Sequence, residues 1–579
     1  MNKLKTLSLA LALAGAALPL HAADMSKVVR TAFEAPETGF DPAKVSDTYS
    51  SAINENIFDP LITYDYNARP PKLIPNTIVA MPAVSADGKV YTFKIKPGIF
   101  FADDPAFKGK KRELTAEDYA YSLKRFADPK VNSPTGYLIS SKLAGLEALA
   151  KAASKSGKLD YSADVPGIKV LDKYTLQLTL SDTNFNLAYV LAMPHFGAVA
   201  REVIEANASN TAAHPVGTGP YRLKEWKPGN KIVLEANPNY RKVVVNGKTV
   251  PLAGRVEVSI IEEDQPRWLS FSNKQLDVLD VTPVPQTALP DFLNIDPKNP
   301  TKVSMKPAFA KTGIKLERQR ELEVTYAYFN MEDPVVGGYG KDKIALRRAI
   351  AMAFPRNETI ANIRRGQAVP VNYLIPAGVA GHNANFKGAP DYNPAAANAL
   401  LDKFGYKIGA DGYRTLPDGK PLAIEKATSP SAINKQWDEY YQKAFDSLKI
   451  RFKLKTAKWN ELNKASHEGK LQMWSLAWSA DFPDGENFMQ LLYGPNSGDG
   501  NAARFKNAEF DRLYAAALKL PHGAERNKLY DQMNKVAAAY QPWMYLDTRI
   551  RNYVAQPYVG NFKKHPVMTT TWRYLDLKK

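Results

Sequence analysis

The sequence predicts an α/β protein of two or three domains. Its 579 residues exceed what a single hydrophobic core usually supports. Hydrophobic residues make up 45% of the chain and charged residues 23%, which is ordinary for a globular protein. Segments with the two-residue period of strands alternate with segments of helical period along most of the chain. This alternation predicts sheets covered by helices.

The N-terminus has the pattern of a secretory signal peptide. Lys3 and Lys5 precede an apolar run over residues 7–20, and Leu20-His21-Ala22 places small or apolar residues at the positions of a cleavage site. We expect cleavage after Ala22, with Ala23 as the second choice. The run is shorter than the roughly 20 apolar residues of a transmembrane helix. The mature protein is therefore expected to be exported and soluble.

The chain contains no cysteine. It therefore cannot form a disulfide, use a thiolate in catalysis or carry a lipid on an N-terminal cysteine. An exported protein without a lipid anchor stays with the cell only where an outer membrane confines it. The sequence thus predicts a periplasmic location, and secretion into the medium is the alternative.

The formal net charge is +18, and removal of Lys3 and Lys5 with the signal peptide lowers it to +16. Such an excess can mark a nucleic-acid-binding protein. The basic residues are scattered, however, and 108–112 is the only dense cluster. We therefore expect a solvated basic surface and no nucleic-acid partner. Attraction to an anionic membrane surface or an anionic partner is the alternative.

The first third of the chain mixes strands and helices. Asp87-Gly88 before an alternating run indicates a hairpin that leads into a strand. Thr115 stands at a capping position ahead of two acidic residues, which favour the positive end of a helix dipole. Pro60 cannot lie inside the helix before it, so the chain turns there. The predicted strands are 26–33, 90–99 and 174–180, and the predicted helices are 46–57 and 114–125.

Two glycines bracket Thr218 just before a predicted strand. A phosphate-binding loop would need a lysine and a following helix here, and both are missing. The segment instead predicts a tight crossing of two backbones and then a hairpin. The second strand of that hairpin is 230–235, its turn is Asn237-Pro238-Asn239-Tyr240, and a strand at 256–262, a helix at 265–274 and an edge strand at 277–279 follow.

A second α/β region begins near residue 324. Asn393 is placed to cap a helix, and Gly405 ends that helix where glycine is favoured. The predicted strands are 324–330 and 450–454, the predicted helices are 344–354, 395–404, 437–448, 459–467 and 524–539, and a mixed segment spans 543–577.

The segment 478–484, Trp-Ser-Ala-Asp-Phe-Pro-Asp, follows directly on the apolar run 472–477. A strand with this ending brings an aromatic face and a carboxylate to its exit, where open α/β sheets bind ligands. A carboxylate beside an aromatic ring favours a cationic group. The segment therefore predicts part of a ligand site.

The same segment resembles the Trp-x-Ala-Asp-Tyr-Pro-Asp-Pro signature of the family 5 periplasmic solute-binding proteins, the dipeptide- and oligopeptide-binding group that serves ABC importers. Seven further blocks resemble the pattern of this family in order and spacing, so that the resemblance spans Phe58 to Val559. These blocks are Phe58-Asp59-Pro60-Leu61, Tyr91-Thr92-Phe93, Leu114-Thr115-Ala116-Glu117-Asp118, Gly217-Thr218-Gly219-Pro220-Tyr221, Asn237-Pro238-Asn239-Tyr240, Leu346-Arg347-Arg348-Ala349-Ile350 and Asn507-Ala508-Glu509-Phe510-Asp511-Arg512-Leu513.

The resemblance implies a two-lobed periplasmic binding protein fold, class II-like, with an extra subdomain in the first lobe. Closure of the lobes would remove the ligand from water, and the hinges would be the few strands that cross between the lobes. We expect no cofactor and no bound metal. The implied parts are a signal peptide at 1–22, lobe I at 23–57, 214–321 and 547–579, its extra subdomain at 58–213, and lobe II at 322–546.

Asp481 is the first candidate for a ligand contact. In peptide-binding members of the family the matching Asp pairs with the α-ammonium of the ligand; the alternative is an Asp that caps the turn before Pro483. Trp478 would line the pocket or take a cation on its face, or else pack in the core, and Ser479 belongs to the same segment. Some oligopeptide-binding members carry an arginine where this chain has Ser475. One anchor for the ligand is thus missing or supplied from elsewhere.

Five further residues are weaker candidates. Tyr545 and Arg549, in the final crossing segment, could replace the missing anchor, and a structural role is the alternative for each. Glu34 and Glu37 lie in the loop after the first strand, where family members contribute backbone contacts to the ligand. Either glutamate could face solvent instead. Tyr221 is the remaining candidate.

The resemblance implies a monomeric binding protein that captures a di- or oligopeptide and delivers it to an inner-membrane ABC permease. A second hypothesis keeps this transport role with another cargo: a nickel chelate, haem, an opine, a glycoside or an antimicrobial peptide. A third is an exported hydrolase, but the sequence holds no His-Glu-x-x-His, Gly-x-Ser-x-Gly or Walker motif. A triad assembled in space escapes this test. The length of a bound peptide is left open.

Overall fold

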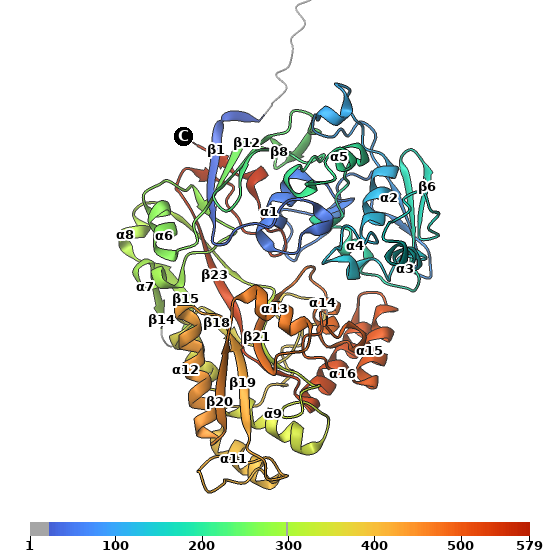
Figure 1. Cartoon of the computed structure of the whole chain (residues 1–579). Coiled ribbons are helices and arrows are strands. Elements are labelled where there is room, and N and C mark those ends of the chain that lie inside the picture. The colour runs from blue at the N-terminus through green and yellow to red at the C-terminus, as the bar shows by residue number, and fades with distance from the viewer. Residues whose placement is uncertain (1–22, 297–298, 499, 579) are drawn as a thin grey trace, which may run out of the picture.

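The computed structural model describes residues 23–296, 299–498 and 500–578, and Figure 1 shows their arrangement. The predicted signal peptide, residues 1–22, lies outside the described residues. In Figure 1 a broad upper body sits on a tapering lower one, and the two are called lobe I and lobe II below. Within the described ranges, no helix is both long and apolar enough to cross a membrane.

Lobe I is built on a four-stranded sheet in the order β1-β12-β9-β8. β1 (Asp24–Phe33) pairs in parallel with β12 (Ala253–Ile260), which pairs antiparallel with β9 (Lys231–Ala236). β8 (Tyr221–Lys227) forms the predicted hairpin with β9. The helix α1 (Thr48–Ile57) packs its apolar face into the core of this sheet.

The extra subdomain lies at the right of lobe I in Figure 1 and holds an antiparallel sheet in the order β4-β5-β7-β6. The helix α2 (Ala116–Arg125) begins as predicted, because the carboxylate of Asp118 accepts the amide of Thr115 at 2.8 Å. β5 is shorter than the predicted strand 90–99, since Pro97-Gly98 turns the chain. The remaining elements are β4 (Ala83–Val84), β5 (Val90–Lys94), β6 (Ile168–Asp172), β7 (Thr175–Thr179), α3 (Leu146–Ser156), α4 (Leu187–Val190) and α5 (Arg201–Ala206).

Lobe II is built on a five-stranded sheet in the order β20-β19-β21-β17-β22. Its interior strand β17 (Glu323–Phe329) is buried at every position, because both faces of the sheet are covered. Tyr326 and Tyr328 point into one hydrophobic core, and Ala327 and Phe329 point into the other. The other strands are β19 (Ala423–Thr428), β20 (Arg451–Thr456), β21 (Met473–Ser479) and β22 (Trp543–Tyr545).

Helices cover the two faces of the lobe II sheet. One face carries α9 (Lys341–Ala353), α11 (Pro394–Lys403) and α12 (Ala432–Ser447), and the other carries α15 (Ala508–Leu518) and α16 (Ala524–Tyr540). The helix predicted at 437–448 begins five residues earlier, where Ser431 caps it by accepting the amide of Asn434 at 3.2 Å. Shorter helices are α10 (Arg356–Asn362), α13 (Trp459–His467) and α14 (Glu486–Met489).

One long strand, β23 (Asp547–Ala555), runs from lobe II into lobe I (Figure 1). It pairs antiparallel with β16 (Lys315–Arg320), β13 (Val278–Leu279) and β18 (Ala368–Pro370). The chain passes between the lobes from β16 to β17 and from β22 to β23, so two neighbouring strands carry both crossings. The residue limits assigned to the lobes from the sequence stay a prediction.

The remaining elements are short. They are β2 (Ile62–Tyr64), β3 (Leu73–Pro75), β10 (Val243–Val245), β11 (Lys248–Val250), α6 (Asp264–Ser272), α7 (Leu289–Phe292), β14 (Leu293–Asp296), β15 (Asn299–Met305), α8 (Pro307–Ala310), β24 (Val559–Gly560) and β25 (Asp576–Leu577).

Candidate functional site

A cavity of about 350 Å³ lies between the two lobes. Lobe I contributes the start of α1, the strand β2 and the C-terminal segment around Lys564 and His565. Lobe II contributes the end of β21 and the loop that follows it, with Ser479 and Asp481. A cavity of this size suits a small ligand, since binding pockets usually measure about 300–1,000 Å³. The predicted strand exit thus forms part of the wall.

Asp481 is held in position by a single neighbour, Asn487 in α14. The side-chain amide of Asn487 donates to one carboxylate oxygen of Asp481 at 2.8 Å, and its oxygen accepts the Asp481 amide at 3.0 Å. The same oxygen accepts the indole N–H of Trp478 at 2.9 Å. The other carboxylate oxygen of Asp481 accepts no hydrogen bond from any residue that the structure describes.

Burial raises the pKa of Asp481 to about 6, and the hydrogen bond from Asn487 offsets only part of this rise. No lysine, arginine or histidine in the described ranges forms an ion pair with the carboxylate. The hydroxyl of Tyr64, in lobe I, is near enough to interact electrostatically with Asp481, and it has no hydrogen-bond partner among the described residues. One wall of the cavity therefore presents an uncompensated carboxylate.

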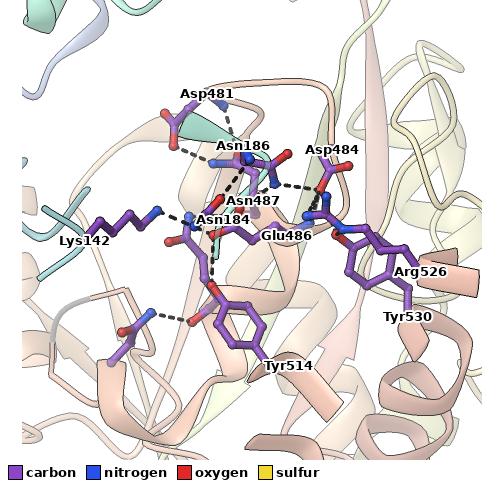
Figure 2. Close-up of polar contacts among 12 residues, drawn as sticks. Lys142, Asn184, Asn186, Asp481, Asp484, Glu486, Asn487, Tyr514, Arg526 and Tyr530 are labelled. Atoms are coloured by element: carbon purple, nitrogen blue, oxygen red, sulfur yellow. Dashed lines mark hydrogen bonds and ion pairs between the residues drawn. The ribbon is translucent and has the colours of Figure 1, made fainter. Parts of the chain in front are cut away.

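Asp484, three residues further on, has the opposite environment. Its carboxylate accepts hydrogen bonds from Tyr530 at 2.7 Å, from Arg526 at 3.0 Å and from Asn186 at 3.0 Å (Figure 2). It also lies 3.1 Å from His522. Burial alone would raise its pKa, but the bond to His522 and the charge of Arg526 outweigh burial and lower the pKa to about 2. Asp484 is a fixed anion inside the protein.

These contacts join lobe II to the extra subdomain. Asn186, at the start of α4, also donates to the carboxylate of Glu486, and Lys142 lies 3.6 Å from the same carboxylate (Figure 2). Phe482 of lobe II is buried in the subdomain core, where it stacks on Tyr189 with ring centres 5.8 Å apart. We call Asn186, Glu486, Phe482, Tyr189 and Lys142, together with Asp484, the latch. It holds the lobes together beside the cavity.

Three cations line the lobe I side of the cavity: Arg551, Lys564 and Arg573. The ammonium of Lys564 donates to the carbonyl oxygens of Asp280 and Thr569, each at 2.8 Å. Arg573 donates to a carbonyl oxygen of α1. The lobe I side of the cavity therefore carries these three cations together with the carboxylates of Glu34, Asp47, Glu55 and Asp59, and Asp481 lines the lobe II side.

Three of the predicted ligand residues line this cavity: Asp481, Ser479 and Glu34. The hydroxyl of Ser479 lies 3.3 Å from the carboxylate of Glu323. Glu34 accepts a hydrogen bond from Tyr49 at 3.1 Å and lies 3.3 Å from a guanidinium nitrogen of Arg267. Whether they touch a ligand stays a prediction.

Two predicted residues of the strand exit do not line the cavity. Trp478 packs against the lobe II core, and its indole nitrogen is used by Asn487. Ser475 turns toward α12, where its hydroxyl lies 3.0 Å from that of Tyr441. Ser475 shares a strand face with Ser479, but it lies four residues before the end of β21, away from the end that meets the cavity. An anchor is therefore not formed at this position.

The other predicted residues have structural contacts instead of a place on the cavity wall. Tyr221 is 1% exposed and donates to the carbonyl of Ala253 at 3.0 Å, so it ties β8 to β12. Glu37 accepts hydrogen bonds from the indole of Trp226 and the amide of Gly229. The positions of Tyr221 and Glu37 give no support to a ligand contact.

Tyr545 is 4% exposed in the lobe II core, where it packs against Trp543. Arg549 forms a two-pronged ion pair with Glu323, at the point where the chain crosses between the lobes. Burial would raise the pKa of Glu323, but the charge and hydrogen bonds of Arg549 lower it to about 2. Both residues stabilise the crossing rather than the cavity.

Sequence reasoning missed Asn487, Tyr64 and Arg551. Asn487 lies six residues after Asp481, on the first turn of the next helix, which is a position that a local motif search could have included. Arg551 lies two residues after Arg549 and faces the same side of the strand, so the sequence alone does not tell which of the two arginines reaches the cavity. Tyr64 lies in the other lobe, and no pattern in the sequence around it indicated a place in the site.

Among the described residues, no group of three or more His, Asp or Glu side chains gathers in a way that could hold a metal ion. Two histidines line the cavity, His195 and His565, and burial lowers their pKa values to about 4 and about 3. They are therefore neutral at physiological pH. The site is a binding cavity with fixed charges.

Two α/β lobes joined by neighbouring strands, with a ligand-sized cavity between them, define the class of two-lobed binding proteins. The sequence matches the family described as bacterial extracellular solute-binding proteins, family 5, middle region, over residues 72–500. The chain belongs to this family.

Relatives of known name align along nearly the whole chain. Heme-binding protein A of Haemophilus influenzae is 26% identical over 536 residues, which cover 90% of this chain and 88% of that protein. Periplasmic oligopeptide-binding protein OppA of Salmonella typhimurium is 23% identical and covers 90% of this chain and 87% of its own length. The solved structure of the periplasmic binding protein DppA from Helicobacter pylori, in complex with the peptide STSA, superposes with a TM-score of 0.75 at 22% identity, covering 95% of this chain and 98% of that one.

Proposed function

We propose that this protein captures a di- or oligopeptide between its lobes in the periplasm and delivers it to an inner-membrane ABC permease. The observation that carries the proposal is the carboxylate of Asp481, which lines the cavity without a cationic partner among the described residues. A peptide ammonium would supply that cation. Relatives named as oligopeptide- and di/tripeptide-binding proteins support the same cargo.

The proposed binding step follows from the charges of the cavity. A peptide α-amino group has a pKa near about 8 and is protonated at physiological pH. Its entry would pair the ammonium with ionised Asp481, and a hydrogen-bonded charge pair removed from water is stronger than one on the surface. Closure brings the hydroxyl of Tyr64 from lobe I toward the same place. The ligand would thus bridge the lobes.

We propose a carrier role without catalysis, and a monomer as the working form. The permease would receive the ligand when the lobes open. Incubation of the purified protein with a peptide that it binds should give one bound peptide per chain and no cleavage product. Release of shorter peptides would support the exported-hydrolase alternative.

Isothermal calorimetry with a panel of di-, tri- and longer peptides tests the proposed cargo. We expect at least one class of peptide to bind in a one-to-one complex, and mass spectrometry of ligand retained through purification should identify the natural cargo. Binding of another class of solute while every peptide fails to bind would refute the proposal.

Haem is the second candidate cargo, because the relative with 26% identity is named a heme-binding protein. A titration of the protein with haem, monitored by the absorbance of haem, distinguishes the haem cargo from the peptide cargo. A saturable change in the absorbance of haem that added peptide does not reverse would favour haem. Displacement of haem by peptide would instead place both ligands in one cavity.

A further inference from the structure

We infer that a second cavity, within lobe I, binds a small organic monoanion that joins one carboxylate to an apolar group. This cavity measures about 400 Å³ and is lined by β2, β3, the loop 96–99, the β10–β11 hairpin and the C-terminal segment. It adjoins the cavity between the lobes, and the residues common to both walls are Thr63, Tyr64, Asn76 and Arg573. None of its wall residues lies between β17 and β22, so the inference does not rest on the proposed peptide cargo.

The charged part of this wall holds more cations than carboxylates. The cations are Lys96, Arg241, Lys242 and Arg573, and the carboxylate in the same wall is that of Asp65. Asp59 pairs with Arg241 at 2.5 Å, and Glu55 interacts electrostatically with Arg573, although neither of these carboxylates lines the second cavity. When both are counted, four cations stand against three carboxylates. A ligand with a single negative charge would neutralise this excess.

Lys96 is the cation with donors left for a ligand. Its half-buried ammonium donates to the carbonyl oxygen of Asn76 at 3.0 Å, which is its one hydrogen bond to the part of the chain that the structure describes. An ammonium has three donors. Burial lowers the pKa of Lys96, and the positive charge of Arg241 lowers it further. Two cations held this close to each other favour an anion beside them.

The cationic part of the wall is fixed before any ligand arrives. The guanidinium of Arg241 donates to Asp59 and to the side-chain oxygen of Asn76, and it lies 4.9 Å from the ring centre of Tyr240. Asn76 therefore holds both cations, since its backbone carbonyl accepts Lys96 and its side chain accepts Arg241. A site that is already ordered loses little conformational entropy on binding.

The rest of the wall is aromatic and aliphatic. Tyr66 and Tyr574 are 5% and 8% exposed, and their rings stack with centres 4.2 Å apart. The aliphatic wall residues are Ile74, Pro75, Pro97, Ile99, Val243, Val245 and Val250. An apolar group of the ligand would leave water against this surface, whereas an inorganic anion gains nothing from it. The wall therefore fits an arylalkyl or alkyl carboxylate.

Calorimetry with 4-phenylbutyrate tests this site, and the neutral 4-phenylbutyramide is the matched probe. We expect saturable one-to-one binding of the carboxylate with a Kd below about 1 mM. The amide should bind about tenfold more weakly, because it brings no charge to Lys96 and Arg241. Inorganic phosphate should also bind at least about tenfold more weakly, because it buries no apolar surface.

Two variants with matched controls locate the bound anion. K96Q removes the ammonium and should weaken phenylbutyrate binding about tenfold, whereas K94Q, at an exposed residue of β5 outside the wall, should not. V243W should fill the cavity and abolish binding. V244W changes the next residue of the same hairpin, where the side chain is 55% exposed and outside the wall, and should leave binding intact.

Lys96 and Val243 do not line the cavity between the lobes, so these losses assign the anion to the second cavity. K96R keeps the charge and should retain most of the affinity, which separates loss of the ammonium from a folding defect. The inference is overturned if phenylbutyrate does not bind saturably to the wild-type protein or if the amide binds equally well. Unchanged binding in both K96Q and V243W also overturns it, because the anion then lies elsewhere. The peptide proposal survives each of these outcomes.

Discussion

Asp481 and Asp484 lie in one loop, three residues apart, and their carboxylates have opposite properties. Burial raises the pKa of Asp481 to about 6, whereas the bond to His522 and the charge of Arg526 outweigh burial and lower the pKa of Asp484 to about 2. Asp484 is buried, and Asp481 is half-buried on the wall of the cavity. The difference shows that hydrogen bonds and nearby charges, and not burial alone, decide the charge state of a carboxylate inside a protein.

The two carboxylates of this loop have different roles. Asp484 is fully satisfied by the protein itself, so it can hold the latch whether or not a ligand is present. Asp481 has a single side-chain donor, Asn487, and an unused oxygen that faces no described partner. We infer that the first carboxylate stabilises the closed form and that the second one is left for the ligand.

The largest expected effect is that of D484N. The substitution removes the charge that compensates Arg526, which is 1% exposed, and loss of one member of a buried pair costs about 3–5 kcal/mol. Denaturant unfolding should show this loss at pH 7.5. D418N, in an exposed turn beside Lys420, is the matched control and should change the free energy of unfolding by less than about 0.5 kcal/mol. A loss below about 1 kcal/mol for D484N would contradict its assignment as the fixed anion.

D481N should change binding and stability in opposite directions. Loss of the carboxylate should weaken peptide binding by about a hundredfold, because a ligand ammonium is left unpaired in the cavity. Ligand-free protein should become more stable at pH 7.5, by up to about 3 kcal/mol, since the ionised carboxylate is disfavoured there. Calorimetry and thermal unfolding measure the two effects. A less stable D481N with unchanged affinity would assign Asp481 to a purely structural role.

The pH dependence follows from the raised pKa of Asp481. Folding favours the protonated carboxyl, so its contribution to stability is present at low pH and is lost as the pH rises through about 6. Peptide binding favours the ionised form, so affinity should fall about fivefold between pH 6 and pH 5 and stay nearly level from 6.5 to 7.5. Calorimetry at these pH values checks the slope. His195 and His565 are neutral across this window, because burial lowers their pKa values to about 4 and about 3.

The smallest effect is expected for N186A, which tests the latch. Asn186 is 0% exposed and donates to Asp484 and Glu486, so its truncation should weaken the closed form by about 1 kcal/mol. Free and amidated peptides should lose affinity equally, about fivefold, and small-angle scattering should show a larger radius of gyration. N207A, in the same subdomain, is the control, because Asn207 bonds only within its own turn. A loss confined to free-acid peptides would place Asn186 in ligand recognition instead.

Much of the fold could be predicted from local patterns. Thr115 and Asp118 start a helix through contacts within one turn, and Asn393 caps another by accepting the amide of Ala396 at 2.9 Å. The hairpin of β8 and β9 was equally visible, because turn residues separate two strands of matched length. Such features depend on residues that are close together in the sequence, so they can be predicted from the sequence alone.

The site could be predicted only in part. Asp481 was predicted because strand, aromatic residue and carboxylate are contiguous and the same residues resemble the family signature. The structure places Asp481 on the cavity wall, and its contact with a ligand stays a prediction. Tyr545 was expected at the ligand and lies in the core, since the period of a strand tells which residues share a face but not which face meets a ligand. Arg549 was expected at the ligand and instead forms an ion pair with Glu323, which lies more than two hundred residues away in sequence.

The sequence by itself determined the alternation of helices and strands, the capped helix starts and the carboxylate at the end of β21, because each of these follows from residues close together in the chain. Only the tertiary structure decided that Asp481 has no cation among the described residues while Asp484 has Arg526, and that Arg549 pairs with Glu323. Charges are paired across space, and burial sets how strongly each pair acts. Neither the partner of a charged side chain nor its burial can be read from the residues next to it in the sequence.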